Sequence, residues 1–202
     1  MVLAASVNAQ QSMIDLSKMP AGAPPREFSF TLTGDGPVSA WKVVADPTAK
    51  QAKAIAQTTT DKTGYRFPLA VYEPIVARSV DVGVNFKPVG GTLDQAAGIA
   101  VRLTDPDDYY LVRADALLND VRFYRVFNGK RQEIKGVTTE VTPHQWHALG
   151  LRAEGDRFTI WFDGTPLFTT ENKTFAKPGK VALWTQADSV THFDALRITK
   201  LD

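Results

Sequence analysis

The 202-residue chain contains no cysteine. Disulfide bonds, thiolate nucleophiles and cysteine-ligated zinc are therefore excluded. This absence does not identify the compartment, because many exported bacterial proteins also lack cysteine. Long hydrophobic runs are missing as well: none approaches the ~20 apolar residues of a membrane-spanning helix. We therefore expect no membrane span.

A charge bias is also absent, since 23 basic residues face 22 acidic ones and the formal net charge is +1. The basic footprint of a nucleic-acid-binding protein is missing, so we expect no nucleic-acid partner. Only three histidines occur, and neither His-x-His nor H-E-x-x-H spacing supports transition-metal catalysis. A G-x-S-x-G nucleophile elbow is not found either.

The N-terminal stretch MVLAASVNAQQ resembles the end of a secretory signal, with Val7 and Ala9 at the small-residue positions before a cleavage site. Two interpretations remain open: a truncated signal of a secreted or periplasmic protein, or a mildly apolar tail. Residues 11–26 carry three prolines and predict a linker. The expected organisation is a signal remnant and linker over 1–26 and a single domain over 27–202, which is long enough for a real core.

Short runs of strand-forming residues follow, separated by turn signals at intervals of about a dozen residues. The expected strands are 27–34, 38–46, 54–60, 65–72, 78–89, 97–104, 109–116, 121–129, 146–155, 157–164, 165–170, 179–186 and 191–201. Asn-Gly in FNGK, Asp-Gly in FDGT and the turn AEGD indicate hairpins, because glycine accepts a positive φ. Only 48–57 is helix-like, and its second half could equally be a strand. The pattern predicts an all-β sandwich or jelly roll.

Alternation within the runs predicts which side chains enter the core. Val80, Val82, Val84 and Phe86 share one face of their strand. In RFTIWFDG, Phe158, Ile160 and Phe162 share one face and Trp161 lies on the other. Trp41 and Trp146 are expected to anchor the core.

Four motifs in order resemble the concanavalin A-like lectin/glucanase superfamily, and within it the laminin-G-like domain of the 3-keto-disaccharide hydrolase group. They are GIAVRLTDPDDYYLVRAD, VRFYRVFNGKR, WHALGLRAEGDRFTIWFDGTPLF and GKVALWTQADSVTHFDALRI. The resemblance spans about 38–201. It implies a jelly roll of two antiparallel sheets, one of them curved with an open face that commonly holds carbohydrate.

The chain also departs from two branches of that superfamily. Retaining β-glucanases carry E-x-D-x-x-E or E-x-D-x-E on one strand, whereas every glutamate here stands without that spacing. The paired signatures of the alginate lyases are missing too. We therefore expect neither of those two activities.

Aromatic and arginine side chains on the open face are the ligand-binding candidates, because sugar rings stack on aromatics and arginines donate to hydroxyls or carboxylates. Trp161, Trp184 and Tyr124 alternate with apolar neighbours, and Arg122 lies in phase with Tyr124. Arg102 is expected to point to the same open face, with pairing to nearby acids as the alternative. For Arg113, pairing with acids is the expectation.

The polar candidates are weaker. Asp108, Asp188 and His192 are the acid/base candidates if the protein is an enzyme. Asp105, Asp107 and Asp194 could hold a structural Ca²⁺ through their oxygens, but Asp-Pro-Asp-Asp is also a good turn sequence and Asp194 could simply cap a loop. We expect His144 in an exposed turn and His147 as a satisfied interior residue.

Three functions fit these observations. The leading hypothesis is an exported protein that binds a saccharide on its curved sheet. The alternative is a glycoside hydrolase or lyase acting on a (3-keto-)disaccharide or related sugar. A third interpretation is a non-catalytic domain that binds protein.

Overall fold

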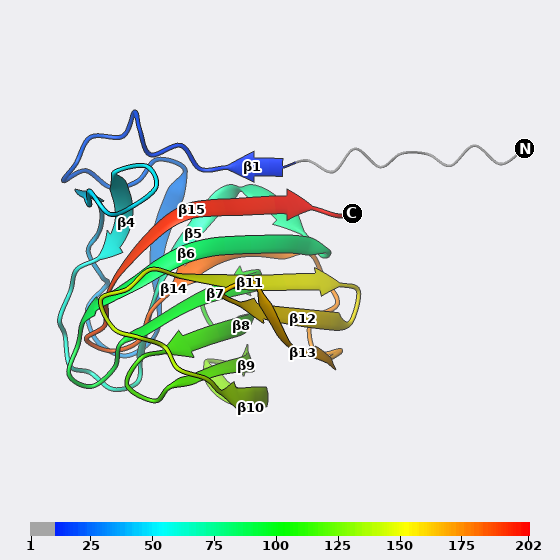
Figure 1. Cartoon of the computed structure of the whole chain (residues 1–202). Coiled ribbons are helices and arrows are strands. Elements are labelled where there is room, and N and C mark those ends of the chain that lie inside the picture. The colour runs from blue at the N-terminus through cyan, green and yellow to red at the C-terminus, as the bar shows by residue number, and fades with distance from the viewer. Residues whose placement is uncertain (1–10) are drawn as a thin grey trace, which may run out of the picture.

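The computed structural model describes residues 11–202, so the expected cleavage positions Val7 and Ala9 lie outside the described residues. The described chain consists of short strands joined by turns (Figure 1). The first eight strands are β1 (Gln11–Met13), β2 (Phe28–Gly34), β3 (Trp41–Ala45), β4 (Lys53–Gln57), β5 (Arg66–Ala77), β6 (Val80–Gly90), β7 (Ala96–Asp105) and β8 (Asp108–Asp115). The others are β9 (Asp120–Phe127), β10 (Lys130–Thr138), β11 (His147–Glu154), β12 (Arg157–Phe162), β13 (Thr165–Glu171), β14 (Gly179–Trp184) and β15 (Val190–Lys200). Within residues 11–202, no helix has the length and apolar character needed to cross a membrane.

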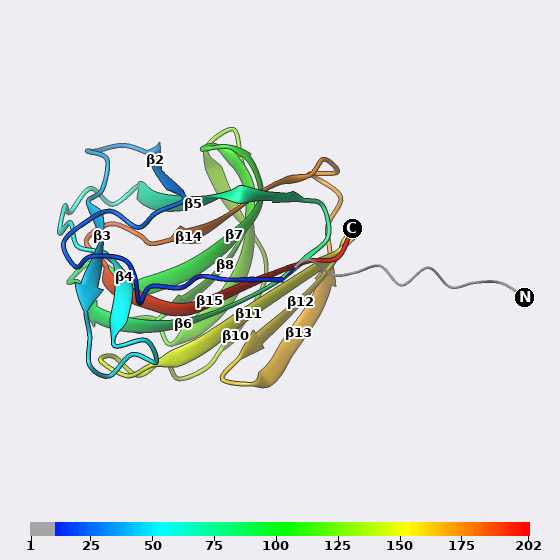
Figure 2. The ribbon, with the colours of Figure 1, turned by 90° about the horizontal axis from the view of Figure 1, so that it is seen from above.

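Two antiparallel sheets pack face to face. Sheet A has the order β13-β12-β11-β6-β15-β4-β3, with β1 added against β15, and sheet B has the order β10-β9-β8-β7-β14-β5-β2. In Figure 2, β5, β14 and β7 belong to one layer, and β15, β6 and β11 belong to the other. The protein is therefore the expected all-β jelly-roll sandwich of the concanavalin A-like kind.

The core lies between the sheets and is built from the alternating residues that the sequence assigned to it. Val80, Val82, Val84 and Phe86 all enter it from β6, and Phe158, Ile160 and Phe162 enter it from β12. Trp41 is buried there as expected. The strand alternation thus identified the inward faces correctly.

All thirteen expected strands are present, and two more were missed. The three-residue β1 is too short to show a pattern, and β10 is mostly polar, with Ile134 and Val137 as its two apolar residues. Residues 48–57 form no helix; their second half becomes β4, the other option. The Asn128-Gly129 and Asp163-Gly164 turns join β9 to β10 and β12 to β13, and all four of these residues have positive φ.

The segment 11–26, expected to be a linker, packs against the sandwich instead. Gln11–Met13 pairs with β15, and in Figure 1 the two strands lie side by side. Ile14, Leu16 and Met19 then enter the core cluster. The apolar residues of this segment fill space at the edge of the core.

Sheet B curls strongly. Its edge strand β10 is five interstrand spacings from β5, roughly 24 Å if the sheet were flat. Nevertheless the Arg131 guanidinium of β10 lies 4.8 Å from the centre of the Phe67 ring of β5. The Tyr65 hydroxyl also donates a 2.7 Å hydrogen bond to the Gly129 carbonyl. These contacts are possible only if the outer face of sheet B is concave.

The buried N-terminal segment gives the first prediction. Leu16 is 1% exposed within the core, so Leu16→Ala should lower the free energy of unfolding by about 2–5 kcal/mol in urea titration. Leu118→Ala is the matched control, because Leu118 is 59% exposed. Equal stability of the two variants would mean that the segment does not pack as described.

Candidate functional site

The concave outer face of sheet B, where a ligand was expected, is filled by its own side chains. Trp184 points to that face as expected, yet it is 0% exposed. Its ring stacks on Phe67 with 5.3 Å between ring centres, and its Nε1 lies 3.3 Å from the Tyr109 hydroxyl. The Arg131 guanidinium lies over the rings of Phe67, Tyr124 and Trp184. Tyr124 and Trp184 are thus outward-facing but not exposed.

Gly98 shows how tightly this face is packed. A methyl carbon placed on Gly98 would lie 2.8 Å from the Val112 carbonyl oxygen and 3.1 Å from the Trp184 ring. Only glycine leaves room for the tryptophan to lie flat on the sheet. The concave face of sheet B is therefore a second packed layer.

Charged residues extend this layer toward one end. Arg113 is buried and pairs with Asp120 and Asp115, so its predicted pairing with acids is confirmed. Arg122 lies on the same face, partly exposed, with Nε 2.6 Å from Asp120 Oδ2 and Nη1 2.8 Å from Glu133. Hydrogen bonds to these carboxylates raise the pKa of Arg122 above its ordinary value. Both arginines are thus already engaged by acids.

Asp94 is the remaining member of this network of charged residues. Burial raises the pKa of Asp94 to about 7, and hydrogen bonding to the Asp115 carboxylate acts in the same direction, against the charges of Arg113 and Arg131. Asp115 Oδ2 is buried without a hydrogen-bond partner among residues 11–202, and Arg113 Nη1 lies 3.6 Å from it. A protonated Asp94 that donates to this oxygen accounts for both observations.

The expected placement of Arg102 on the open face is wrong. Arg102 adopts φ +54° at a bulge in β7, which shifts the strand phase by one residue. Leu103 consequently joins the outer cluster while Arg102 turns inward. Its guanidinium is buried and donates to the carbonyls of Arg78 (2.9 Å), Phe175 (2.7 Å) and Gly155. Arg102 ties loops together at one end of the sandwich.

The three acid/base candidates do not come together. Asp188 is buried and accepts hydrogen bonds from the Thr92, Leu93 and Asp94 backbone N–H groups. Burial opposes the charge, but these bonds outweigh it and lower the pKa of Asp188. Asp188 fastens the loop between β6 and β7.

His192 lies on the other sheet. Its Nδ1 is 2.8 Å from Asp46 Oδ2, on the outer face of sheet A. Lys87 completes the cluster, with its Nζ 2.5 Å from the same carboxylate oxygen. Asp108 begins β8, directly after the β7–β8 turn, and its Oδ1 accepts from the Asn128 backbone N–H at 2.9 Å.

The metal candidates accept hydrogen bonds from other groups of the protein. Asp105 Oδ1 accepts from the Asp107 N–H at 2.8 Å, and the Asp107 carbonyl accepts from the Gly129 N–H at 3.0 Å. Asp194 lies at a bulge inside β15 and accepts from Gln51 Nε2 at 3.0 Å and from the Ala195 N–H at 2.6 Å. Within residues 11–202, no three acidic or histidine side chains gather as a metal site. Structural calcium stays a prediction.

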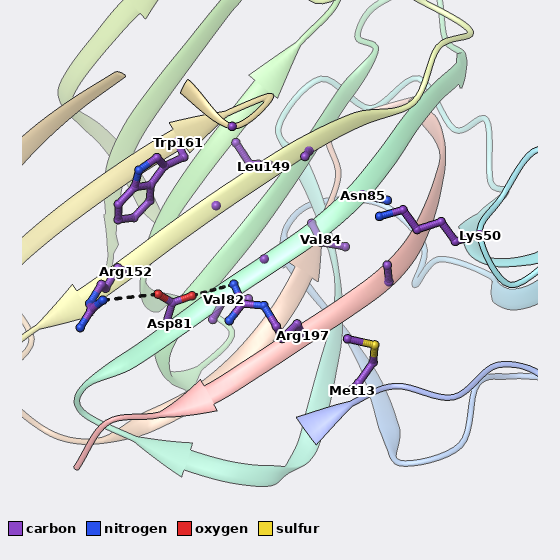
Figure 3. A pocket seen from close by; sticks show the side chains of 15 residues that line it. Met13, Lys50, Asp81, Val82, Val84, Asn85, Leu149, Arg152, Trp161 and Arg197 are labelled. Carbon is purple, nitrogen blue, oxygen red and sulfur yellow. Dashed lines mark hydrogen bonds and ion pairs between the residues drawn. The ribbon is translucent and has the colours of Figure 1, made fainter. Parts of the chain in front are cut away.

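The open site lies on the outer face of sheet A. There a groove of about 440 Å³ crosses β15, β6, β11 and β12 (Figure 3). It is lined by Met13, Lys50, Asp81, Val82, Gly83, Val84, Asn85, Ala148, Leu149, Gly150, Arg152, Trp161, Gly164, Ala195 and Arg197. Trp161 is the one sequence-predicted ligand residue among them.

One row of paired residues forms the floor and walls of this groove. Trp161 pairs with Gly150, Gly150 with Gly83, Gly83 with Arg197, and Arg197 with Met13. Because paired residues in antiparallel strands share a face, all five point outward. The floor of two glycines lies between Trp161 and Arg197, whose strands are roughly 14 Å apart.

The backbone does not require glycine at either floor position. Neither Gly83 nor Gly150 has a positive φ, and a methyl carbon on Gly150 would make an ordinary 3.5 Å contact with Trp161 Cβ. On Gly83 it would lie 3.2 Å from Arg197 Nη2, the flexible end of a long side chain. Unlike Gly98, these glycines leave space above the sheet open.

Polar groups stand beside the floor. Arg197 Nη2 donates to Asp81 Oδ1 at 3.0 Å, and Arg152 Nη1 lies 3.9 Å from Asp81 Oδ2. Figure 3 shows the two arginines on either side of Asp81, with Asn85 and Lys50 toward the other end. The groove therefore combines an aromatic wall, a flat floor and several hydrogen-bonding groups.

Other expectations on sheet A have mixed outcomes. His147 is interior and satisfied as expected, with Nδ1 2.7 Å from Asp163 Oδ2 and Nε2 3.0 Å from the Thr142 carbonyl. His144 is exposed in its turn. Trp146 is not a core anchor: it lies half-buried on the outer face, under Lys87, and donates to Thr48 Oγ1 at 2.9 Å.

The glycine pair is the feature that sequence reasoning missed. A signal existed, because an isolated glycine inside a strand pattern indicates a bulge or a close approach of another group. Gly83 in DVGVNF and Gly150 in ALGLR both fit this description. Their alignment depends on the register of β6 against β11, which neither run reveals alone.

Comparisons with known proteins agree on the fold. The chain resembles a carbohydrate-binding module from Bacillus subtilis (TM-score 0.64, 20% identity, 85% of this chain and 96% of that chain). It also resembles the β-glucanase of Bacillus licheniformis (TM-score 0.59, 14% identity, 95% and 98%). A third is domain 4 of an extracellular arabinanase from Geobacillus stearothermophilus, in complex with arabinotriose (TM-score 0.61, 14% identity, 95% and 93%). No family model matches the chain, and no curated protein matches it.

Asp94 gives a prediction on pH. Its pKa in the folded protein, about 7, is above the ordinary value of 3.8. Between these values the folded state binds more protons than the unfolded state, so stability falls as pH rises. Asp94→Asn keeps the group uncharged and able to donate to Asp115, so the wild type should lose Tm relative to this variant between pH 5 and pH 8. The exposed Asp35→Asn serves as control, and a parallel pH dependence of wild type and Asp94→Asn would contradict the assignment.

Proposed function

We propose that this protein binds a saccharide in the groove on sheet A. The observation that carries the proposal is the floor of two paired glycines beside Trp161. Glycine in a strand interior costs stability relative to alanine, by roughly 0.5–1 kcal/mol at each position. Two such residues side by side, with no conformational need for either, are explained by a ligand that lies flat on the backbone.

The groove has the chemistry that a sugar requires. An aromatic ring offers a surface for the apolar C–H face of a pyranose or furanose. Asp81 and Asn85 can accept hydrogen bonds from hydroxyls, while Arg152 and Arg197 can donate to ring and hydroxyl oxygens. The volume of about 440 Å³ lies within the roughly 300–1,000 Å³ of ordinary ligand pockets.

The proposed site is on the opposite sheet from the one that the family resemblance implied. The curved sheet B has its concave face filled by Trp184, Phe67 and Arg131, so a ligand there would have to displace packed side chains. The structural neighbours named as a carbohydrate-binding module and as an arabinanase domain with bound arabinotriose support saccharide binding as a function of this fold. These neighbours do not indicate which of the two sheets binds the ligand.

Binding is favoured over hydrolysis. Glycoside hydrolysis commonly uses two carboxyl groups about 5–9.5 Å apart. Of the lining residues in the described part of the chain, Asp81 is the one carboxylate. The neighbouring carboxyls Asp94 and Asp115 lie outside the groove, so they do not complete a carboxyl pair there. Binding of a protein partner is disfavoured because the groove carries charged groups beside one aromatic residue instead of a large apolar patch.

The first test removes the aromatic wall. Trp161→Ala should abolish saccharide binding in calorimetry against a panel of neutral and acidic oligosaccharides, with little change in Tm, because Trp161 lies outside the core. Trp146→Ala is the matched control: it removes a half-buried tryptophan from the same outer face without touching the groove. Retained binding in Trp161→Ala, or equal losses in both variants, would remove the groove as the site.

The second test fills the floor. Gly150→Val should abolish binding and leave Tm unchanged or higher, because valine favours strands and the space above Gly150 is open. Gly64→Val adds the same side chain in an exposed loop, where no atom lies within 4 Å of the new methyl carbon, and should bind normally. Undiminished binding by Gly150→Val would place the ligand elsewhere.

A further inference from the structure

We infer that the ligand of the groove is an acidic saccharide whose uronate carboxylate is held by Arg152 and Arg197. This inference rests on the proposed function and specifies its substrate class. It starts from the balance of charge: Lys50, Arg152 and Arg197 line the groove against Asp81 alone. The lining carries three cations and one anion, and positive charge remains in excess even when Glu154, which pairs with Arg152 at 2.9 Å from outside the lining, is counted.

The two arginines retain unused donors. A guanidinium carries five N–H donors, and Arg197 uses Nη2 for Asp81 and Nη1 for a 3.3 Å hydrogen bond to Thr199. Arg152 donates from Nη2 to Glu154 at 2.9 Å, and its Nε is buried without a hydrogen-bond partner within residues 11–202. Neither guanidinium is saturated by the protein.

The position of Asp81 prepares these donors for a second carboxylate. Asp81 on β6 lies between Arg152 on β11 and Arg197 on β15 (Figure 3). It accepts a 3.0 Å hydrogen bond from Arg197, while Arg152 is held by Glu154 at 2.9 Å and lies 3.9 Å from Asp81. Holding the guanidiniums in place lowers the conformational entropy lost on binding. The side chains of Arg152 and Arg197 remain 40% and 39% exposed, so a ligand can reach them.

Guanidinium matches a carboxylate better than it matches hydroxyls. Its planar fork donates two parallel hydrogen bonds to the two oxygens of a carboxylate, and such charge-assisted bonds are roughly twice as strong as neutral ones. The geometry then orients the ligand, with a sugar ring on Gly83 and Gly150 beside Trp161 and its carboxylate toward the Arg152–Asp81–Arg197 row.

The experiment uses a pair of ligands with the same rings and different charge. Trigalacturonate and its fully methyl-esterified form are titrated into the whole protein by calorimetry, with triglucuronate as a second uronate and a sulfated trisaccharide as a different anion. We expect at least tenfold tighter binding of one of the uronates than of its ester, with the difference shrinking as salt rises. Arg152→Gln and Arg197→Gln should each reduce the acid-to-ester ratio several-fold, whereas Arg157→Gln, exposed outside the groove, should leave it unchanged.

Asp81→Asn gives the sharpest readout because its effect changes sign. If the ligand is a uronate, removing the competing charge of Asp81 strengthens acid binding while the asparagine oxygen still accepts from the arginines. If Asp81 accepts from the hydroxyls of a neutral sugar, the same change weakens binding.

The outcomes separate the inference from the proposed function. A neutral saccharide bound as tightly as its acidic counterpart, and lost in Trp161→Ala, overturns the uronate and leaves the groove as a saccharide site. Preference for the sulfated sugar over both uronates also overturns the inference. No binding of any saccharide to the wild type removes the proposed function together with it.

Discussion

The guanidinium of Arg131 lies on the rings of Phe67, Tyr124 and Trp184, and the curl of sheet B depends on this contact. A cation held over aromatic faces is attracted by their quadrupoles, and burial strengthens the attraction. Here one such cation joins β10 to β5, two strands separated by four others. The sheet therefore has apolar side chains packed on both faces, and the surface that a curved sheet would present to solvent becomes interior.

The outer face of sheet A, unlike that of sheet B, is not fully packed. The inner face of sheet A holds the core, but the centre of the outer face has almost no side-chain volume where Gly150 and Gly83 meet. A strand usually gains stability from cross-strand side-chain pairs, and this pair contributes none. Stability supplied by the doubly packed sheet B allows sheet A to keep this row unfilled, and the unfilled row forms the floor of the groove.

The inward and outward faces of the strands could be read from the sequence, because a period of two is a local property. Trp161, Trp184 and Tyr124 all point outward as predicted. Whether an outward side chain meets water is not local: it depends on how far the sheet curls, and Arg131 reaches Trp184 only through contacts between residues distant in sequence. The wrong placement of Arg102 also has a non-local cause. One bulge residue with a positive φ exchanges the inward and outward faces for the residues that follow it in β7. The groove was not predicted for a related reason. Its two glycines are aligned by the register between β6 and β11, which the sequence of either strand alone does not give.

The short β1 has a consequence for the size of ligand that the groove admits. Met13 forms its outer wall, and β1 is held only at the edge of sheet A, by pairing with β15. Edge segments open at a lower free energy than central strands, and here fraying would stop at Ile14, which is anchored in the core. The Met13 end of the groove can therefore open without disturbing the sandwich, whereas the Trp161 end, on β12, is fixed. Under the proposed function, we expect a saccharide longer than the groove to extend past its Met13 end and not past Trp161.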